Sequence, residues 1–175
     1  LIVIVSLLVI TILINILFKK QIIRSILIKN IPDINLEEAL KRGEDELIEF
    51  KSKKSLEYPE TLLKSIVSLA NSGGGIIFMG INDDATIDPF VVQSIKEIDN
   101  IKLKITNYIK EHINPTPDVL IETINLSDNS ILLKIKIISS FDPIVYSFNG
   151  IFYRRLGNSD IPMDFWTLQK ILSNF

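Results

Sequence analysis

Apolar residues are concentrated at the start of the chain, where residues 1–18 contain no charged side chain. An α-helix of this length rises about 1.5 Å per residue and reaches roughly 27 Å, close to the hydrocarbon thickness of a bilayer. Lys19, Lys20 and Arg24 follow directly. Because positive charges mark the cytoplasmic end of a membrane helix, the pattern predicts a single-pass transmembrane helix at 1–18, then a basic juxtamembrane segment at 19–34, with the remaining domain in the cytoplasm.

The order of these features favours a membrane helix over two alternatives. A cleaved signal peptide carries its positive charges before the apolar run and small residues after it, the reverse of the order here. A buried core helix is seldom so uniformly apolar, and the polar side chains of this run are Ser6, Thr11 and Asn15. We therefore expect the lipid bilayer to be a partner of residues 1–18 and the protein to be located in the membrane.

Four later segments have the spacing or the end signals of helices. They are residues 36–43, which Asn35 is expected to cap, then 60–72, 95–112 and a last helix from about Met163. We expect this last helix to bury one face and to be anchored to the core by Trp166. Its predicted inward residues are Phe165, Leu168, Ile171 and Leu172.

Strand patterns occupy most of the space between these helices. The predicted strands are residues 47–51, 75–81, 119–126, 131–138, 144–148 and 151–155. The last two flank Asn149-Gly150, which is a strong hairpin signal. Strands and helices together predict an α+β domain at 35–175, in which helices pack on a mixed β-sheet.

Composition narrows the chemistry that this domain can perform. The 175 residues carry a net charge of −2, contain no cysteine and include a single histidine, His112. The lack of cysteine excludes disulfides, thiolate zinc sites and a cysteine nucleophile, and nothing around His112 indicates a serine–histidine–acid triad. A strongly basic chain would by itself indicate a nucleic-acid partner. At this charge, nucleic-acid binding has to depend on a local patch.

Three short motifs follow one another in the domain. The first is Gly43-Glu44 with LIEFK at 47–51, and the second is LANSGG at 69–74 running into IFMGINDD at 77–84. The third is SFDP at 140–143 followed by YRRLGNS at 153–159. Together they resemble the Schlafen-type AlbA-like domain of bacterial proteins. The resemblance implies a fold of that type and a nucleic-acid partner, either RNA or DNA.

The glycine-rich turn has two interpretations. Gly73 and Gly74 follow a helix and precede a strand, so left-handed backbone is expected there. The exposed amides of such a turn hold an anion such as a phosphate in some proteins. The alternative is a tight connection from helix to strand without a ligand. A Walker loop is excluded because no Gly-Lys-Ser/Thr follows.

Carboxylates in the first two motifs raise the question of catalysis. Some Schlafen proteins cleave RNA, and the resemblance implies that their three metal-binding carboxylates correspond to Glu44, Glu49 and Asp83. Three such groups would hold Mg²⁺ or Mn²⁺ in a metal-dependent endoribonuclease. Asp84 competes with Asp83 for the third place. The alternative is that Glu49 forms a structural salt bridge, and Lys51 and Arg155 are the candidate partners.

The third motif supplies basic and aromatic side chains. The resemblance implies that Arg155 contacts a phosphate, where a guanidinium can form two hydrogen bonds. Tyr153 is expected to stack on a base. Lys51 adds positive charge close by, together with Lys53 and Lys54. The alternative is a solvated hairpin whose aromatic residue packs in the core.

We expect the chain to be a membrane-anchored cytoplasmic nucleic-acid-binding domain with a regulatory role and without catalysis. The first alternative is the metal-dependent ribonuclease. The second is a non-catalytic protein-interaction module that forms a homodimer. The ribonuclease would require a metal ion for cleavage. The homodimer would have a mass that depends on the protein concentration.

Overall fold

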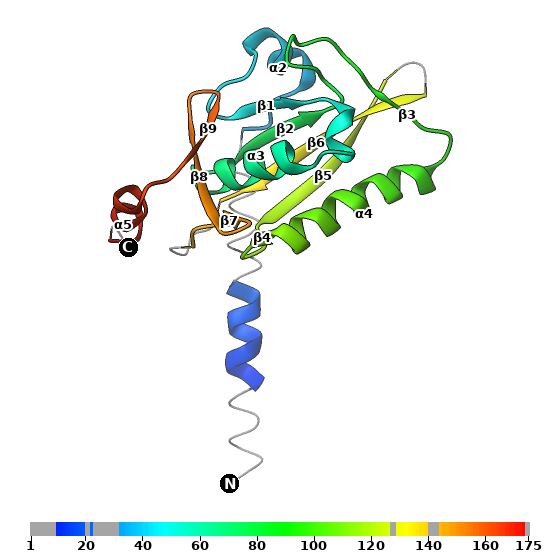
Figure 1. The fold of residues 1–175 in the computed structure, drawn as a ribbon. Helices are drawn as coiled ribbons and strands as arrows, with labels where there is room; N and C mark the ends of the chain where they lie inside the picture. Colours follow the sequence, from blue (N-terminus) through cyan, green and yellow to red (C-terminus); the bar gives the residue numbers. More distant parts are fainter. Residues whose placement is uncertain (1–9, 20–21, 23–31, 127–128, 140–143, 174–175) are drawn as a thin grey trace. The chain divides into compact units, whose positions relative to one another are not determined.

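The computed structural model describes residues 10–19, 22, 32–126, 129–139 and 144–173 (Figure 1). The chain divides into two compact units, Leu1–Pro32 and Asp33–Phe175. In the first unit, residues 10–19 are helical. No helix among the described residues is long and apolar enough to span a bilayer. Half of the predicted membrane helix, residues 1–9, lies outside the described residues, so that helix stays a prediction.

The second unit has the predicted α+β class. Its elements are, in chain order, α2 (Leu36–Arg42), β1 (Ile48–Lys51), the 3-10 helix η1 (Lys53–Leu56), α3 (Glu60–Ala70), β2 (Gly75–Met79), β3 (Phe90–Val91), α4 (Ile95–His112), β4 (Ile113–Asn114), β5 (Asp118–Asn125), β6 (Ser130–Ile138), β7 (Ser147–Phe148), β8 (Ile151–Leu156), β9 (Ser159–Pro162) and α5 (Phe165–Ser173). All four predicted helices and all six predicted strands are therefore present, with shifted ends.

The larger sheet is mixed, as predicted. β1 runs parallel to β2, whereas β2, β3 and β5 each pair antiparallel with β6. Alternate residues of the central strands, such as Ile77 and Ile135, are directly opposite each other and point to one face. They are fully buried in a cluster that includes residues of α3 and α4, so both helices cover this face (Figure 1).

The two covering helices form where the sequence provides caps and an apolar stripe. Pro59 precedes α3, whose Leu62 and Ile66 are completely buried. Ser94 caps α4, because its hydroxyl accepts a hydrogen bond from the Glu97 amide at 3.3 Å. Ile105 of α4 is also completely buried, as its spacing predicts.

The opposite face of the sheet combines aromatic rings with charge. Phe50 and Phe78 pack edge to face, with ring centroids 6.4 Å apart. Lys134 lies over the Phe78 ring, and its ammonium group and that of Lys136 contact Asp33 at 2.8 and 3.0 Å. The hydrogen bonds from Lys134 and Lys136 lower the pKa of Asp33 to about 2. The second unit thus begins with a residue that is tied to the sheet.

A smaller sheet with the order β4-β7-β8-β9 adjoins the larger one. The predicted hairpin joins β7 to β8, and Asn149 and Gly150 have φ angles of 48° and 79°. Both residues therefore adopt the left-handed backbone that a two-residue turn with the twist of the strands requires. This hairpin carries Tyr153 and Arg155 back toward the first strand.

The predicted packing of the last helix is wrong for Phe165, Trp166 and Leu172, whereas Leu168 and Ile171 are partly buried. α5 has no buried residue, and the exposed fractions of Phe165 and Trp166 are 69% and 74%. Leu172 is also half exposed. The two aromatic rings pack on each other, with centroids 5.5 Å apart, instead of on the core. The apolar spacing was sufficient to identify the helix, but not to predict that Phe165, Trp166 and Leu172 are exposed.

Candidate functional site

The predicted site residues of the first and third motifs meet in a buried polar cluster. It consists of Glu49 from β1, Ser65 from α3, Arg155 from β8 and Asp160 from β9, and we call it the Arg155 cluster. The Ser65 hydroxyl donates a hydrogen bond to Asp160 at 2.6 Å and lies 3.1 Å from Glu49. Four elements of the domain, β1, α3, β8 and β9, therefore meet through side chains at one point.

Arg155 makes the largest number of contacts in this cluster. Its side chain is 1% exposed, and its Nη atoms lie 2.5 Å from Glu49 and 2.9 Å from Asp160. The guanidinium also donates hydrogen bonds to the carbonyl oxygens of Asp45 and Ile48. Burial alone would lower the pKa of Arg155, but the charges of Glu49 and Asp160 outweigh it and raise this pKa.

Glu49 has the structural role that the sequence left open as an alternative. It is 4% exposed, and Lys51 on the same face of β1 forms a second ion pair with it. One carboxylate oxygen, Oε1, is bound by Lys51 and Ser65, whereas Oε2 is paired with Arg155 by charge and accepts no hydrogen bond from the described residues. The structure therefore has the structural salt bridge that was the alternative, and Glu49 pairs with both Lys51 and Arg155.

The glycine-rich turn also has a structural role, because several of its amides form hydrogen bonds with the end of α3. The amides of Asn71, Ser72 and Gly74 donate hydrogen bonds to carbonyl oxygens in the last turns of α3. Gly73 and Gly74 have φ angles of 100° and 91°, the left-handed backbone expected there. Since these amides close the carboxyl end of a helix, which carries partial negative charge, the turn does not resemble a phosphate cradle.

Asn71, at the end of α3, connects the second motif to the third. Its side-chain amide donates hydrogen bonds to the carbonyl oxygens of Tyr146 and Tyr153, both at 2.8 Å. Its side-chain oxygen accepts a hydrogen bond from the Tyr146 amide, also at 2.8 Å. Ser72 adds a fourth link by accepting a hydrogen bond from the Arg155 amide. The helix end is thereby fixed to the hairpin.

The three carboxylates of the implied metal site lie in different surroundings. Glu44 is partly buried and accepts a hydrogen bond from the Phe50 amide, Glu49 belongs to the Arg155 cluster, and Asp83 is exposed. Burial raises the pKa of Glu44, which disfavours its charged form. No three acidic or histidine side chains of the described chain lie where they could hold a metal ion. These residues do not fit Mg²⁺ or Mn²⁺ as arranged here, and Asp84 is bound to Thr86 instead.

The predicted nucleic-acid contacts are mostly buried, apart from the exposed Gly73 and the partly exposed Lys51. Tyr153 is 6% exposed and packs in the core, so its ring has no free face for a base. Lys51 and Arg155 are paired with Glu49. Gly73 is exposed, but Gly74 is buried. The residues that carry the family resemblance therefore hold the domain together, and an accessible site has to be sought elsewhere.

An open groove with basic and aromatic side chains lies between η1 and α4. Its volume is about 690 Å³, and we call it the lysine groove. It is lined by Lys53, Lys54, Leu56, Glu57, Tyr58, Phe90 and Lys104. Tyr58 is 73% exposed, so its ring is free to contact a ligand. Leu56 and Phe90 are more buried and anchor the groove to the core.

Electrostatics favour an anion in this groove. Lys53 is partly neutralised by Asp88, whose carboxylate lies 2.6 Å from its ammonium group. Lys54 and Lys104 are exposed and have no acidic partner in the part of the chain that the structure describes. The Lys104 ammonium group lies 5.8 Å from the centre of the Tyr108 ring, a weak contact at an exposed site. Glu57 contributes a single opposing charge.

Sequence reasoning identified only part of this groove. Lys53 and Lys54 were visible as a short basic cluster after the first strand. Lys104 comes from another helix, and its participation depends on how α4 packs beside η1. The spacing of Ile101, Ile105 and Ile109 on the buried side of α4 places Lys104 at the edge of this stripe, where a long side chain can reach solvent. The spacing could have indicated that Lys104 is accessible, but not that it lines a groove together with Lys53 and Lys54.

Comparison with known proteins identifies both a family profile and a related fold. The profile described as Schlafen, AlbA_2 matches residues 44–164. A Corynebacterium diphtheriae protein, DIP2311, is similar in structure with a TM-score of 0.51 and 19% identity, over 84% of this chain and 28% of that protein. The N-terminal domain of a RecG-related protein from Nitrosomonas europaea has a TM-score of 0.48 and 19% identity, over 72% of this chain and 88% of that domain. No curated protein matches significantly.

Proposed function

Because the chain belongs to the Schlafen AlbA_2 family, we propose that its second unit binds nucleic acid and that the lysine groove holds the phosphate backbone. The observation that carries this proposal is the open groove in which Lys54 and Lys104 have no acidic partner among the described residues. Exposed ammonium groups bind phosphates as point charges, and an exposed tyrosine such as Tyr58 stacks on bases.

The same observations limit the affinity and the chemistry. A net charge of −2 gives no long-range attraction to a polyanion, so binding depends on local contacts and weakens with salt. Weak, salt-sensitive binding of this kind is sufficient for a regulatory role. The ribonuclease alternative gains no support from the arrangement of Glu44, Glu49 and Asp83. Homodimer formation stays a prediction.

The proposed position of the phosphate backbone is tested by reversing the charges of Lys54 and Lys104, which have no acidic partner among the described residues. We expect the double substitution Lys54→Glu and Lys104→Glu to weaken binding of labelled single-stranded RNA or DNA at least about 10-fold at low salt. The slope of log affinity against log salt should fall in magnitude by about 1.4, since each phosphate contact to a single strand contributes about 0.7. Fluorescence anisotropy of the full chain in mild detergent measures both quantities.

A matched control separates the groove from overall charge. Lys96→Glu with Lys170→Glu changes the net charge by the same amount at exposed positions that do not line the groove. This variant should bind almost as the wild type does. Equal losses in the two variants would show that binding follows net charge alone and would contradict the proposed location.

We further propose that residues 1–18 anchor this module at the cytoplasmic face of a membrane. The uncharged run and the three basic residues that follow support this proposal. In a flotation experiment with liposomes, the full chain should rise with the lipid. Val5→Asp with Leu13→Asp should leave it in the dense fraction, because each aspartate at the centre of a span costs about 2.5–3.5 kcal/mol. Flotation of this variant would contradict the anchor.

A further inference from the structure

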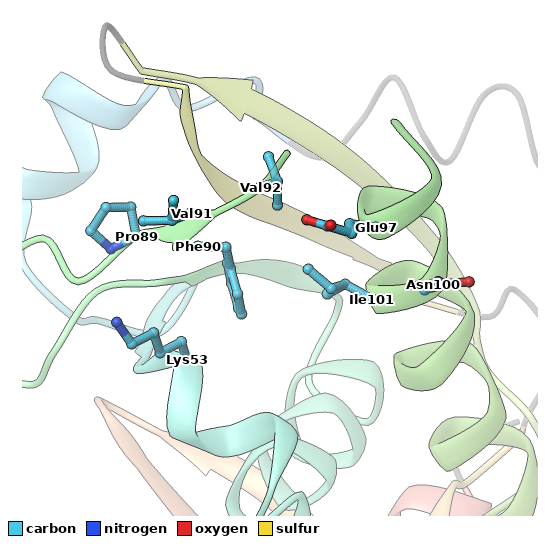
Figure 2. A pocket seen from close by; sticks show the side chains of 8 residues that line it. All are labelled: Lys53, Pro89, Phe90, Val91, Val92, Glu97, Asn100 and Ile101. Atoms are coloured by element: carbon cyan, nitrogen blue, oxygen red, sulfur yellow. The ribbon is translucent and has the colours of Figure 1, made fainter. Parts of the chain in front are cut away.

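A second hollow adjoins the lysine groove and has different chemistry. Its volume is about 450 Å³, within the range of roughly 300–1,000 Å³ for small-ligand pockets. Its apolar walls include Pro89, Phe90, Val92 and Ile101, and its polar groups include Lys53 and Glu97. Figure 2 shows Ile101 and Glu97 reaching from α4 toward Phe90 and Val92. We call this hollow the Phe90 pocket.

The carboxylate of Glu97 is held in place at this pocket by the start of α4. One of its oxygens accepts a hydrogen bond from the Gln93 amide at 2.8 Å, while the Glu97 amide donates to the Ser94 hydroxyl. These two hydrogen bonds resemble a capping box, except that the Glu97 carboxylate accepts from the residue before the cap, and they fix the side chain relative to the backbone. Each carboxylate oxygen accepts more than one hydrogen bond, so Glu97 retains acceptor capacity toward the pocket.

The Phe90 pocket and the lysine groove are neighbours that share part of their lining. Lys53 and Phe90 line both of them. A strand whose phosphates lie along Lys54 and Lys104 would therefore pass the mouth of the pocket. Its apolar walls suit the flat faces of a ring, and Glu97, the one acidic residue among the described residues of its lining, can accept hydrogen bonds from a ring edge. Phosphate contacts and ring contacts are thus available side by side.

From this adjacency we infer that the Phe90 pocket takes one unpaired nucleobase of a single strand and prefers guanine. The inference rests on the nucleic-acid-binding function proposed above. A base in a duplex is stacked on its neighbours and paired along its edge, so it cannot enter a pocket with apolar walls without being unpaired. The ligand class is therefore single-stranded nucleic acid rather than a duplex.

The preference for guanine follows from the charge on Glu97. An ionised carboxylate only accepts hydrogen bonds. Guanine presents two neighbouring N–H donors on its pairing edge, N1–H and the N2 amino group, which match the two oxygens of a carboxylate. Adenine and cytosine present one amino group beside an acceptor nitrogen. Thymine and uracil place their single N–H between two carbonyl oxygens, which a carboxylate repels.

The test uses short oligothymidines that carry a single central guanine, adenine, cytosine or abasic site. The wild-type full chain should bind the guanine oligonucleotide about 10-fold more tightly than the unmodified oligothymidine, the effect of one good bidentate contact. The matching duplex should bind no more tightly than the oligothymidine. Anisotropy at low salt measures all of these affinities under one condition.

Glu97→Gln is the decisive variant because the glutamine side chain keeps an oxygen that can accept from the Gln93 amide, so the start of α4 is preserved. The carboxamide donates as well as accepts, and the preference for guanine should therefore disappear while binding of the oligothymidine is retained. Thermal unfolding followed by circular dichroism should confirm that the variant is folded.

The possible failures can be told apart. If all oligonucleotides bind equally and Glu97→Gln changes nothing, while Lys54→Glu with Lys104→Glu still weakens binding, the base pocket is overturned and the lysine groove stands. If no oligonucleotide binds the wild type even at low salt, the proposed function fails and the base pocket fails with it.

Discussion

Replacing Arg155 by methionine is expected to lower the free energy of unfolding by about 3–5 kcal/mol, the cost of removing one partner from a buried ion pair. The substitution would leave Glu49 and Asp160 without the cation that contacts both at 2.5 and 2.9 Å. It would also remove the donors to the carbonyl oxygens of Asp45 and Ile48. Urea unfolding of the full chain in mild detergent, followed by circular dichroism, measures the loss.

The neighbouring arginine provides the control. Arg154 points to the other side of β8 and is partly exposed, so Arg154→Met should change stability by no more than about 0.5 kcal/mol. Adding Glu49→Gln to Arg155→Met should recover part of the loss, because it removes one uncompensated charge. If the two methionine variants unfolded at the same urea concentration, the Arg155 cluster would not be a structural centre.

The second large effect is expected at Asn71. Asn71→Ala removes three hydrogen bonds to the backbone of Tyr146 and Tyr153 and leaves the polar groups of that backbone partly buried without partners. At about 1 kcal/mol for each bond, the free energy of unfolding should fall by about 3 kcal/mol. The same urea titration measures this effect.

Two further variants show which part of the asparagine matters. Asn71→Asp keeps an acceptor for the Tyr146 amide but replaces two donors by a charge beside two carbonyl oxygens, so it should be at least as harmful as alanine. Asn158→Ala changes an exposed asparagine and should have little effect. A wild-type urea midpoint for Asn71→Ala would mean that the contacts of the helix end with the hairpin contribute nothing to stability.

Local patterns were sufficient to predict the regular elements of this domain. Leu62, Ile66 and Leu69 recur at helical spacing and are all completely buried in α3. Asn35 was expected to cap a helix, and its side chain does accept a hydrogen bond from the Glu38 amide. Both signals are local, because helical periodicity and a helix cap each depend on residues that are only a few positions apart. The family resemblance was likewise confirmed over residues 44–164.

The roles of the site residues could not be predicted in the same way. A carboxylate such as Glu49 has the same sequence signal whether it holds a metal ion or an arginine, and its partner Arg155 lies in a strand far along the chain. The lysine groove depends on the packing of α4 beside η1, which determines where Lys104 lies. Two-residue strands such as β3 and β4 carry too few residues for any alternation to be visible.

The distance in sequence between Arg155 and its partners also has a consequence for synthesis. Its contacts reach back to Asp45, Ile48 and Glu49, and the bond to the Ile48 carbonyl spans 107 positions. A nascent chain emerges from the ribosome with Glu49 long before the cation that neutralises it, and contacts between distant residues form slowly. The first strand therefore remains incomplete until the hairpin has been made. A ribosome that stalls before residue 155 would release a chain that holds most of the helices and strands but lacks the group that closes them.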